Sequence, residues 1–150
     1  MITVEEEDGD TPAGAQLRAA QRAELDARYG NSSHEPGMPP SGEDMLVFVV
    51  ARDDSSVGIG CGGLRLLAGN EAEIKRMYVI PAERGRGVSV AILRKLEDSA
   101  RAHGIHTLKL ETGSRQLDAV RFYEREGYTR IEPFGPYVEA LTSICYARTL

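Results

Sequence analysis

The chain has 150 residues, a length that fits one domain (residues 1–150) able to bury a hydrophobic core. Its formal net charge of −5 disfavours nucleic acid and anionic membranes as partners, because both attract basic surfaces. Hydrophobic residues make up 41% of the chain, yet none of its apolar runs approaches the roughly 20 residues of a membrane span. The N-terminus shows neither a basic leader nor an apolar stretch, so the cytoplasm is the expected compartment.

The two cysteines, Cys61 and Cys145, lie far apart and show neither CxxC spacing nor a neighbouring histidine cluster. Metal sites and disulfide frameworks need such patterns. We therefore expect two buried free thiols and no bound metal.

The N-terminal part predicts a short strand near residues 2–6 and then a helix. Thr11 and Pro12 occupy the N-cap and first helical positions of a stretch rich in Ala, Leu, Gln, Glu and Arg that runs to about Arg28. Residues 30–42 are rich in glycine, proline and serine and lack apolar periodicity, so they predict a mobile loop.

Three apolar runs, at 45–51, 57–67 and 71–80, are separated by turn residues and predict an antiparallel meander. The middle run contains Gly58, Gly60 and Gly63 in GxGxxG spacing. A dinucleotide-binding motif requires a helix directly after these glycines, whereas here a strand continues, which excludes that function. We expect the glycines to relieve crowding or to bend the strand near a ligand.

Beyond Pro81 the pattern predicts a helix at 88–103, a strand at 107–111, a helix at 116–126 and late strands at 128–131 and 141–147. The first of these helices repeats apolar residues at helical spacing on one face: Val88, Ile92, Leu96 and Ala100. The expected class is α+β (mixed α/β), with a mostly antiparallel sheet of six to seven strands and about four helices on its faces.

The segment with the clearest chemistry is the short loop between the third predicted strand of the meander and the next helix. Gly85 and Gly87 leave room for a ligand, and the first helical amides have no intrahelical partner, so the loop suits an anion such as a diphosphate. Arg84 and Arg86 add charged donors. Taken alone, the loop also fits an ordinary surface turn with two solvated arginines. The GxxxxGK[ST] spacing of a nucleotide-binding P-loop is absent.

These residues resemble the GNAT superfamily of N-acetyltransferases, whose signature is Arg or Gln, two residues, Gly, one residue and Gly or Ala. Residues 84–88 meet it, and Ser89, a small residue, stands where the family more often has glycine or alanine. Residues 73–79 resemble the family's fourth strand, and residues 119–128 resemble its late helix and turn. The resemblance covers about 45–150, in the family's order of motifs. In this family the region corresponding to residues 1–44 shapes the acceptor site.

The resemblance implies a sheet whose central strands splay apart, with a β-bulge where Lys75 and Arg76 interrupt the alternation of the fourth strand. The pantetheine arm of acetyl-CoA would enter this gap. The implied cofactor contacts are the strand residues Met77, Tyr78 and Val79, the loop and helix residues Arg84, Gly85, Arg86, Gly87, Val88 and Ser89, and the residues Gln116 and Tyr123. Gln116 falls where many relatives carry asparagine.

Two residues are implied in catalysis. Tyr123 matches the tyrosine that protonates the departing thiolate, although it also fits a core aromatic beside Phe122. Glu73 matches the position of a general base in several members, and it also fits a solvated carboxylate paired with Lys75 or Arg76. Glu111, and the segment 134–137, are weaker candidates for the acceptor side.

The expected function is therefore transfer of an acetyl group from acetyl-CoA to a primary amine, by direct attack in a ternary complex. A non-catalytic acetyl-CoA sensor remains an alternative, because the same loop would serve it. Acetyl-CoA and an amine acceptor are the expected partners, with a homodimer possible as in many relatives. The net charge of the chain does not locate the acceptor pocket or identify the amine.

Overall fold

A computed structural model of the chain describes residues 1–30 and 45–150. Its elements, in chain order, are β1 (Thr3–Glu6), α1 (Pro12–Tyr29), β2 (Met45–Arg52), β3 (Gly58–Leu66), β4 (Glu71–Val79), η2 (Pro81–Glu83), α2 (Val88–Ala102), β5 (Thr107–Gly113), α3 (Leu117–Arg125), β6 (Thr129–Ile131), η3 (Gly135–Tyr137) and β7 (Ser143–Thr149).

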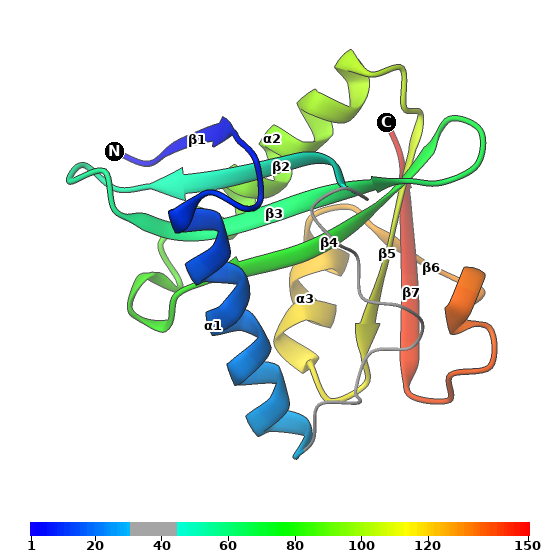
Figure 1. Cartoon of the computed structure of the whole chain (residues 1–150). Coiled ribbons are helices and arrows are strands. Elements are labelled where there is room, and N and C mark those ends of the chain that lie inside the picture. Colours follow the sequence, from blue (N-terminus) through cyan, green and yellow to red (C-terminus); the bar gives the residue numbers. More distant parts are fainter. Residues whose placement is uncertain (31–44) are drawn as a thin grey trace.

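The strands form one seven-stranded sheet in the order β1-β2-β3-β4-β5-β7-β6 (Figure 1). All neighbouring strands are antiparallel except β4 and β5, which run parallel. The predicted class and the predicted meander of β2, β3 and β4 are confirmed. The described residues contain three α-helices and two short 3₁₀ helices, against the expected four or so.

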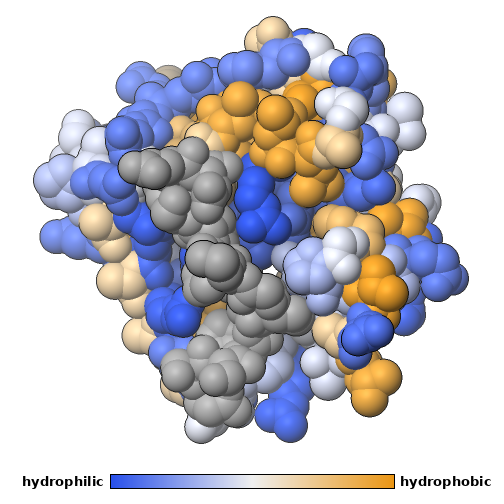
Figure 2. Space-filling view, turned by 45° about the vertical axis from the view of Figure 1, so that its right-hand side comes forward, coloured by the Kyte–Doolittle hydropathy of each residue, from blue (hydrophilic) through white to orange (hydrophobic). Residues whose placement is uncertain are grey.

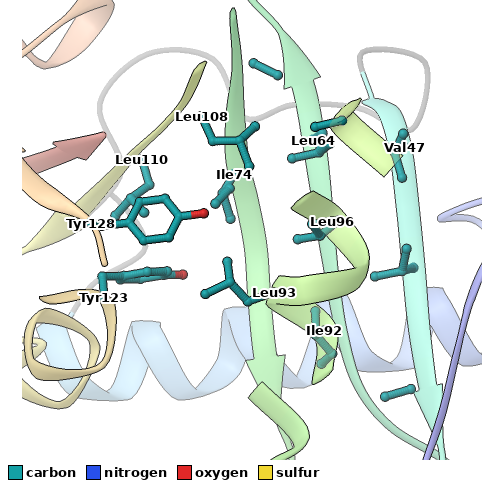
Figure 3. Packing of buried hydrophobic residues seen from close by; sticks show 14 of the residues in the cluster. Val47, Leu64, Ile74, Ile92, Leu93, Leu96, Leu108, Leu110, Tyr123 and Tyr128 are labelled. Atoms are coloured by element: carbon teal, nitrogen blue, oxygen red, sulfur yellow. The ribbon is translucent and has the colours of Figure 1, made fainter. Parts of the chain in front are cut away.

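Helices cover both faces of the sheet (Figure 1). The larger core lies between α2, part of α3 and the strands, and it includes the predicted apolar stripe of α2. Figure 3 shows Ile92, Leu93 and Leu96 of α2 turned toward the strand residues of this core. The smaller core lies under α1, where Leu17 packs with Phe48, Val50 and Cys61.

The glycines of β3 allow α2 to lie close to the sheet. A Cβ on Gly60 would lie 2.9 Å from Ile92 Cδ1, and one on Gly62 would lie 2.9 Å from Ile92 Cγ2. Both distances are shorter than real Cβ contacts, so a larger residue at either position would force Ile92 or its helix to move. The expectation that these glycines relieve crowding is confirmed.

Strands β4 and β5 share only a short stretch of pairing before they part. The paired residues are Glu71–Glu73 on β4 and Thr107–Lys109 on β5, although β4 continues to Val79 and β5 to Gly113. The predicted bulge is present: the register of β3 and β4 shifts between Cys61 and Gly63, and Arg76 has a left-handed φ of 62°. The bulge turns β4 in the region where its partner strand is lost.

The loop after α1 and the start of β7 differ from the expected bounds or lie outside the described residues. The predicted loop at 30–42 lies outside the described residues except for Gly30, which caps α1 with a φ of 77°. Strand β7 starts at Ser143 rather than at 141, because Leu141 is fully exposed and the Ser143 amide still belongs to a turn that ends on the Ala140 carbonyl.

In the part of the chain described here, no helix has the length and apolar composition needed to cross a membrane.

The strained backbone at Arg76 generates a stability prediction. Asparagine tolerates the left-handed conformation, whereas a β-branched residue does not. We expect Arg76→Val to unfold at lower denaturant concentration than Arg76→Asn, by about 1 kcal/mol in free energy of unfolding. Both variants remove the arginine side chain, so the difference isolates the backbone. Equal stability of the two would contradict a left-handed bulge at this position.

Candidate functional site

A pocket lies where β4 and β5 part, and four elements form its walls. The helix α1 provides Gln21, Leu25 and Tyr29, and the two strands and α3 provide most of the other lining residues: Ile74, Lys75, Arg76, Met77, Leu110, Glu111, Thr112, Gly113, Gln116, Ala119, Tyr123 and Thr142. Figure 2 brings the β5–β7 side of the molecule forward and shows hydrophilic residues (blue) in a hollow at the centre of that face, below a group of hydrophobic residues (orange). The bulge and the splay together open this space.

A second pocket lies at the N-terminus of α2 and is lined by Val79, Glu83, Arg84, Gly85, Gly87, Val88, Ser89, Val90, Phe122 and Arg125. Gly87 is the N-cap of α2 and makes no side-chain cap hydrogen bond. The N–H groups of the first helical turn have no acceptor inside the helix, so they face this pocket with the positive end of the helix dipole. Tyr123 lines the first pocket and its neighbour Phe122 lines the second, which makes the two pockets adjacent.

Gly85 and Gly87 are needed here first for their backbone conformation. Their φ angles are 78° and 82°, and a Cβ on either would have no atom of residues 1–30 or 45–150 within 4 Å. Within the chain alone, therefore, glycine is favoured by the left-handed φ rather than by crowding. The open space beside both residues is where a bound anion can approach the main chain.

The two arginines of the loop are placed differently. The Arg84 guanidinium donates to both oxygens of Glu24, at 2.8 and 2.9 Å, and to the Val79 carbonyl at 2.9 Å. Its amide donates to the Pro81 carbonyl at 3.3 Å. Arg84 therefore fastens the loop to α1, whereas the exposed Arg86 side chain lies 3.5 Å from Glu83. Gly85–Ser89 is the stretch of main chain open to an anion.

Tyr123 is both a core residue and a wall of the pocket. Its ring packs edge-to-face on Phe122 and on Tyr128, with centroids 5.0 and 5.7 Å apart. Only 6% of the residue is exposed, and burial raises the pKa of its phenol above the ordinary value. Within the described part of the chain, no hydrogen bond of the Tyr123 hydroxyl is found, so the group is available to a ligand.

Glu73 is completely buried and is held by charged and polar neighbours. Arg65 donates to one carboxylate oxygen at 2.9 Å, and the Tyr137 hydroxyl donates to the other at 2.6 Å. The Lys75 ammonium donates to the Tyr137 oxygen at 3.1 Å and lies 3.9 Å from Glu73. Glu73 is thus paired with a basic residue, which was one of the two expectations from the sequence. It is buried rather than solvated, and it does not line the pocket between β4 and β5.

Sequence reasoning missed Arg65 and Tyr137 as partners of Glu73. A signal for Arg65 exists, because residues equally distant from a tight turn face each other in an antiparallel hairpin, and Arg65 pairs with Glu73 across the turn centred on Gly69. Tyr137 lies in the segment expected near the acceptor side, but its contact with Glu73 joins residues 64 positions apart and has no local signal.

Gln116 and Glu111 both lie on the pocket wall. Gln116 is the N-cap residue of α3, and its side-chain amide donates to the Tyr29 hydroxyl at 3.3 Å. Glu111 accepts a hydrogen bond from the Ser143 hydroxyl at 2.5 Å. The structure therefore brings a carboxylate into the gap, although it is Glu111 and not Glu73.

Two further pocket residues were not anticipated. The side chain of Gln21 donates from Nε2 to the Met77 carbonyl at 2.9 Å, while its buried Oε1 finds no partner among the described residues. The same holds for the buried Oγ1 of Thr112. The sequence gives no sign of either, because an unsatisfied atom is a property of the packed structure.

Cys61 and Cys145 are free and buried, as predicted. Burial raises the pKa of the Cys61 thiol to about 12 and also raises that of Cys145, so both thiols are poor nucleophiles at neutral pH. Across residues 1–30 and 45–150, no group of three or more His, Cys, Asp or Glu side chains is arranged to hold a metal ion.

Comparison with known proteins agrees with this architecture. The model of the family described as "Acetyltransferase (GNAT) family" matches residues 15–128. The chain belongs to the GNAT family. An IAA acetyltransferase from Azospirillum brasilense is 36% identical over 120 residues, which cover 76% of this chain and 78% of that protein. The GNAT resemblance seen in the sequence is thus confirmed, and the chain is an N-acetyltransferase.

Solved GNAT-like structures superpose over the whole chain. A structure from Klebsiella pneumoniae subsp. pneumoniae has a TM-score of 0.85 and 29% identity, and covers 100% of this chain and 98% of its own. The PaiA N-acetyltransferase of Thermoplasma acidophilum, solved in complex with coenzyme A, has a TM-score of 0.73 and 17% identity, with 100% and 99% of the two chains covered. At 17% identity, the likeness to the PaiA structure shows a shared fold and no more.

The α2 N-terminus of this GNAT chain yields a binding prediction. In Gly87→Glu, a carboxylate beside the diphosphate of coenzyme A would repel it by about 4 kcal/mol at a separation of 4 Å. We expect calorimetry to show a loss of coenzyme A affinity of roughly 100-fold or more.

Gly104→Glu is a matched control, because Gly104 also has a positive φ, of 74°, and open space around it. Both variants should lose about 1–2 kcal/mol of stability from backbone strain. Only Gly87→Glu should lose affinity, and equal affinity in the two variants would remove the anion site from α2.

Proposed function

We propose that this GNAT enzyme transfers an acetyl group from acetyl-CoA to a primary amine by direct attack in a ternary complex. The observation that carries the proposal is the adjacency of the two pockets. One presents main-chain donors at the start of α2, and the other opens between β4 and β5 with Tyr123 in its wall. The coenzyme A complex of the PaiA relative supports the same ligand here.

The chain's donors fit the two ends of acetyl-CoA. The diphosphate would be held by the amides from Gly85 to Ser89, with Arg86 adding positive charge. The pantetheine arm would run along Met77, Tyr78 and Val79, where β4 has lost β5 as a partner. Gln116, at the start of α3, would contact the arm through its side-chain amide.

In the proposed reaction, the neutral amine nitrogen forms a bond to the thioester carbonyl carbon, and the carbon–sulfur bond breaks. Tyr123 donates its hydroxyl proton to the departing sulfur, giving the free thiol of coenzyme A. The nitrogen loses one proton to solvent, and the phenolate regains a proton from solvent. Burial raises the pKa of the Tyr123 phenol, so the hydroxyl carries its proton throughout the neutral pH range.

The two carboxylates near the site take separate roles in this proposal. Glu111 lies on the pocket wall and would attract the acceptor amine. Glu73, proposed from the sequence as a general base, has both oxygens hydrogen-bonded by Arg65 and Tyr137. We assign it a positioning role, in which it fixes Tyr137 and Lys75 beside the acceptor side of the pocket.

The enzymatic proposal is tested by release of free thiol from acetyl-CoA in the presence of amino acids, polyamines, aminoglycosides and peptides. We expect Tyr123→Phe to lower kcat roughly 100-fold, the usual contribution of a general acid, while coenzyme A affinity stays nearly constant. The enzyme's own thiols are buried, so a thiol reagent reports coenzyme A.

Tyr128→Phe is the control, because it removes a neighbouring hydroxyl that bonds Glu97 outside the pocket. It should leave kcat near that of the unaltered chain. Unchanged turnover in Tyr123→Phe would exclude Tyr123 as the acid. If the chain binds acetyl-CoA but releases no thiol from it with any of the amines, the result would instead favour a non-catalytic acetyl-CoA sensor.

The pKa of Tyr123 gives a pH prediction. A raised pKa means that the acid form persists beyond about pH 10, where ordinary tyrosine ionises, and is lost only as the pH rises through the higher folded value. We expect no decline of kcat from this group between about pH 7 and pH 10. A decline in that window that is absent from Tyr123→Phe would contradict the assignment.

A further inference from the structure

Two buried side-chain oxygens in the described part of the chain lack a hydrogen-bond partner, and both line the same pocket. They are Gln21 Oε1 on α1 and Thr112 Oγ1 on β5. Buried polar atoms are nearly always paired in folded proteins, since an unpaired group loses its hydration without gaining a hydrogen bond. Their joint occurrence in the gap between β4 and β5 indicates that the missing partner belongs to a ligand of that gap.

Thr112 is the more informative of the two because it is 4% exposed and its hydroxyl cannot turn to bulk water. Residues of β5 alternate between buried and half-buried, so Thr112 shares a face with Leu108 and Leu110. Figure 3 shows Leu108 and Leu110 on the side of the sheet where Tyr123 and Tyr128 lie. The Thr112 hydroxyl is therefore on the wall that also carries Tyr123.

A threonine hydroxyl can donate one hydrogen bond and accept others. On the same face, Leu108 and Leu110 are almost completely buried. Valine has nearly the shape of threonine and would fill this position without an unpaired atom. A buried hydroxyl at position 112 therefore suits a ligand group that accepts a hydrogen bond deep between β4 and β5.

We propose that Thr112 hydrogen-bonds the thioester group of acetyl-CoA and positions it beside the Tyr123 hydroxyl. This inference rests on the proposed function, because it assumes that the acyl end of acetyl-CoA enters the gap. The main acceptors at that end are the thioester carbonyl oxygen and, more weakly, the sulfur. With Tyr123 on the same wall, a donor from Thr112 would fix the thioester in the orientation in which its sulfur receives the proton.

The test uses Thr112→Val, which removes the hydroxyl and keeps the shape. Without ligand, the variant should be more stable, with a Tm higher by about 2–4 °C, because an unpaired buried hydroxyl is lost. Calorimetry should show acetyl-CoA affinity lowered about tenfold. Affinity for desulfo-coenzyme A, which lacks the thioester, should be unchanged. Thr112→Ser, which keeps the hydroxyl, should retain acetyl-CoA affinity.

Thr107→Val is the matched control, because Thr107 lies on the same strand but lines neither of the two pockets. It should alter affinity for neither ligand. If the unaltered chain binds acetyl-CoA and Thr112→Val binds it equally well, the inference is wrong while the proposed function stands. An equal loss for acetyl-CoA and desulfo-coenzyme A would also overturn the thioester contact. If the unaltered chain binds neither molecule, the proposed function fails and this inference fails with it.

Discussion

Strands β4 and β5 run parallel and share hydrogen bonds only from Glu71–Glu73 to Thr107–Lys109, after which each continues without the other. Unpaired strand edges inside a protein need new partners, because buried main-chain groups rarely remain without hydrogen bonds. The left-handed residue Arg76 produces the bulge in β4, and β5 is held in its own direction by β7 along its whole length. The pocket proposed as the site of this GNAT enzyme is the space that results.

Contacts between distant segments hold the two ends of that space in place. At one end, Arg84 joins the glycine loop to Glu24 of α1, so the loop and the helix that lines the gap are fixed together. At the other end, the buried Glu73 accepts hydrogen bonds from Arg65 and Tyr137 and so joins β3, β4 and the segment before β7. Between them, Tyr123 and Thr112 place buried hydroxyl groups on the wall of the pocket. Buried polar groups interact strongly with a ligand, because the local dielectric constant is lower than in water.

Features encoded by neighbouring residues were predictable from the sequence, and features made by tertiary contact were not. The glycine loop, the start of α2 and the apolar stripe of α2 follow from local pattern, and so does the bulge once the family resemblance is seen. The pairing of Arg84 with Glu24 joins residues 60 positions apart, so the link it makes between the glycine loop and α1 has no local signal. The burial of Glu73 and the unpaired Thr112 hydroxyl likewise depend on packing, which periodicity does not encode.

The most direct measurement is a crystal structure of the chain with bound acetyl-CoA. The account predicts the diphosphate against the amides of Gly85 to Ser89, the pantetheine arm between β4 and β5, and the sulfur within hydrogen-bond reach of the Tyr123 hydroxyl. Acetyl-CoA bound at another surface, or with its thioester outside the gap, would contradict the central claim that the parted strands form the acyl-transfer site.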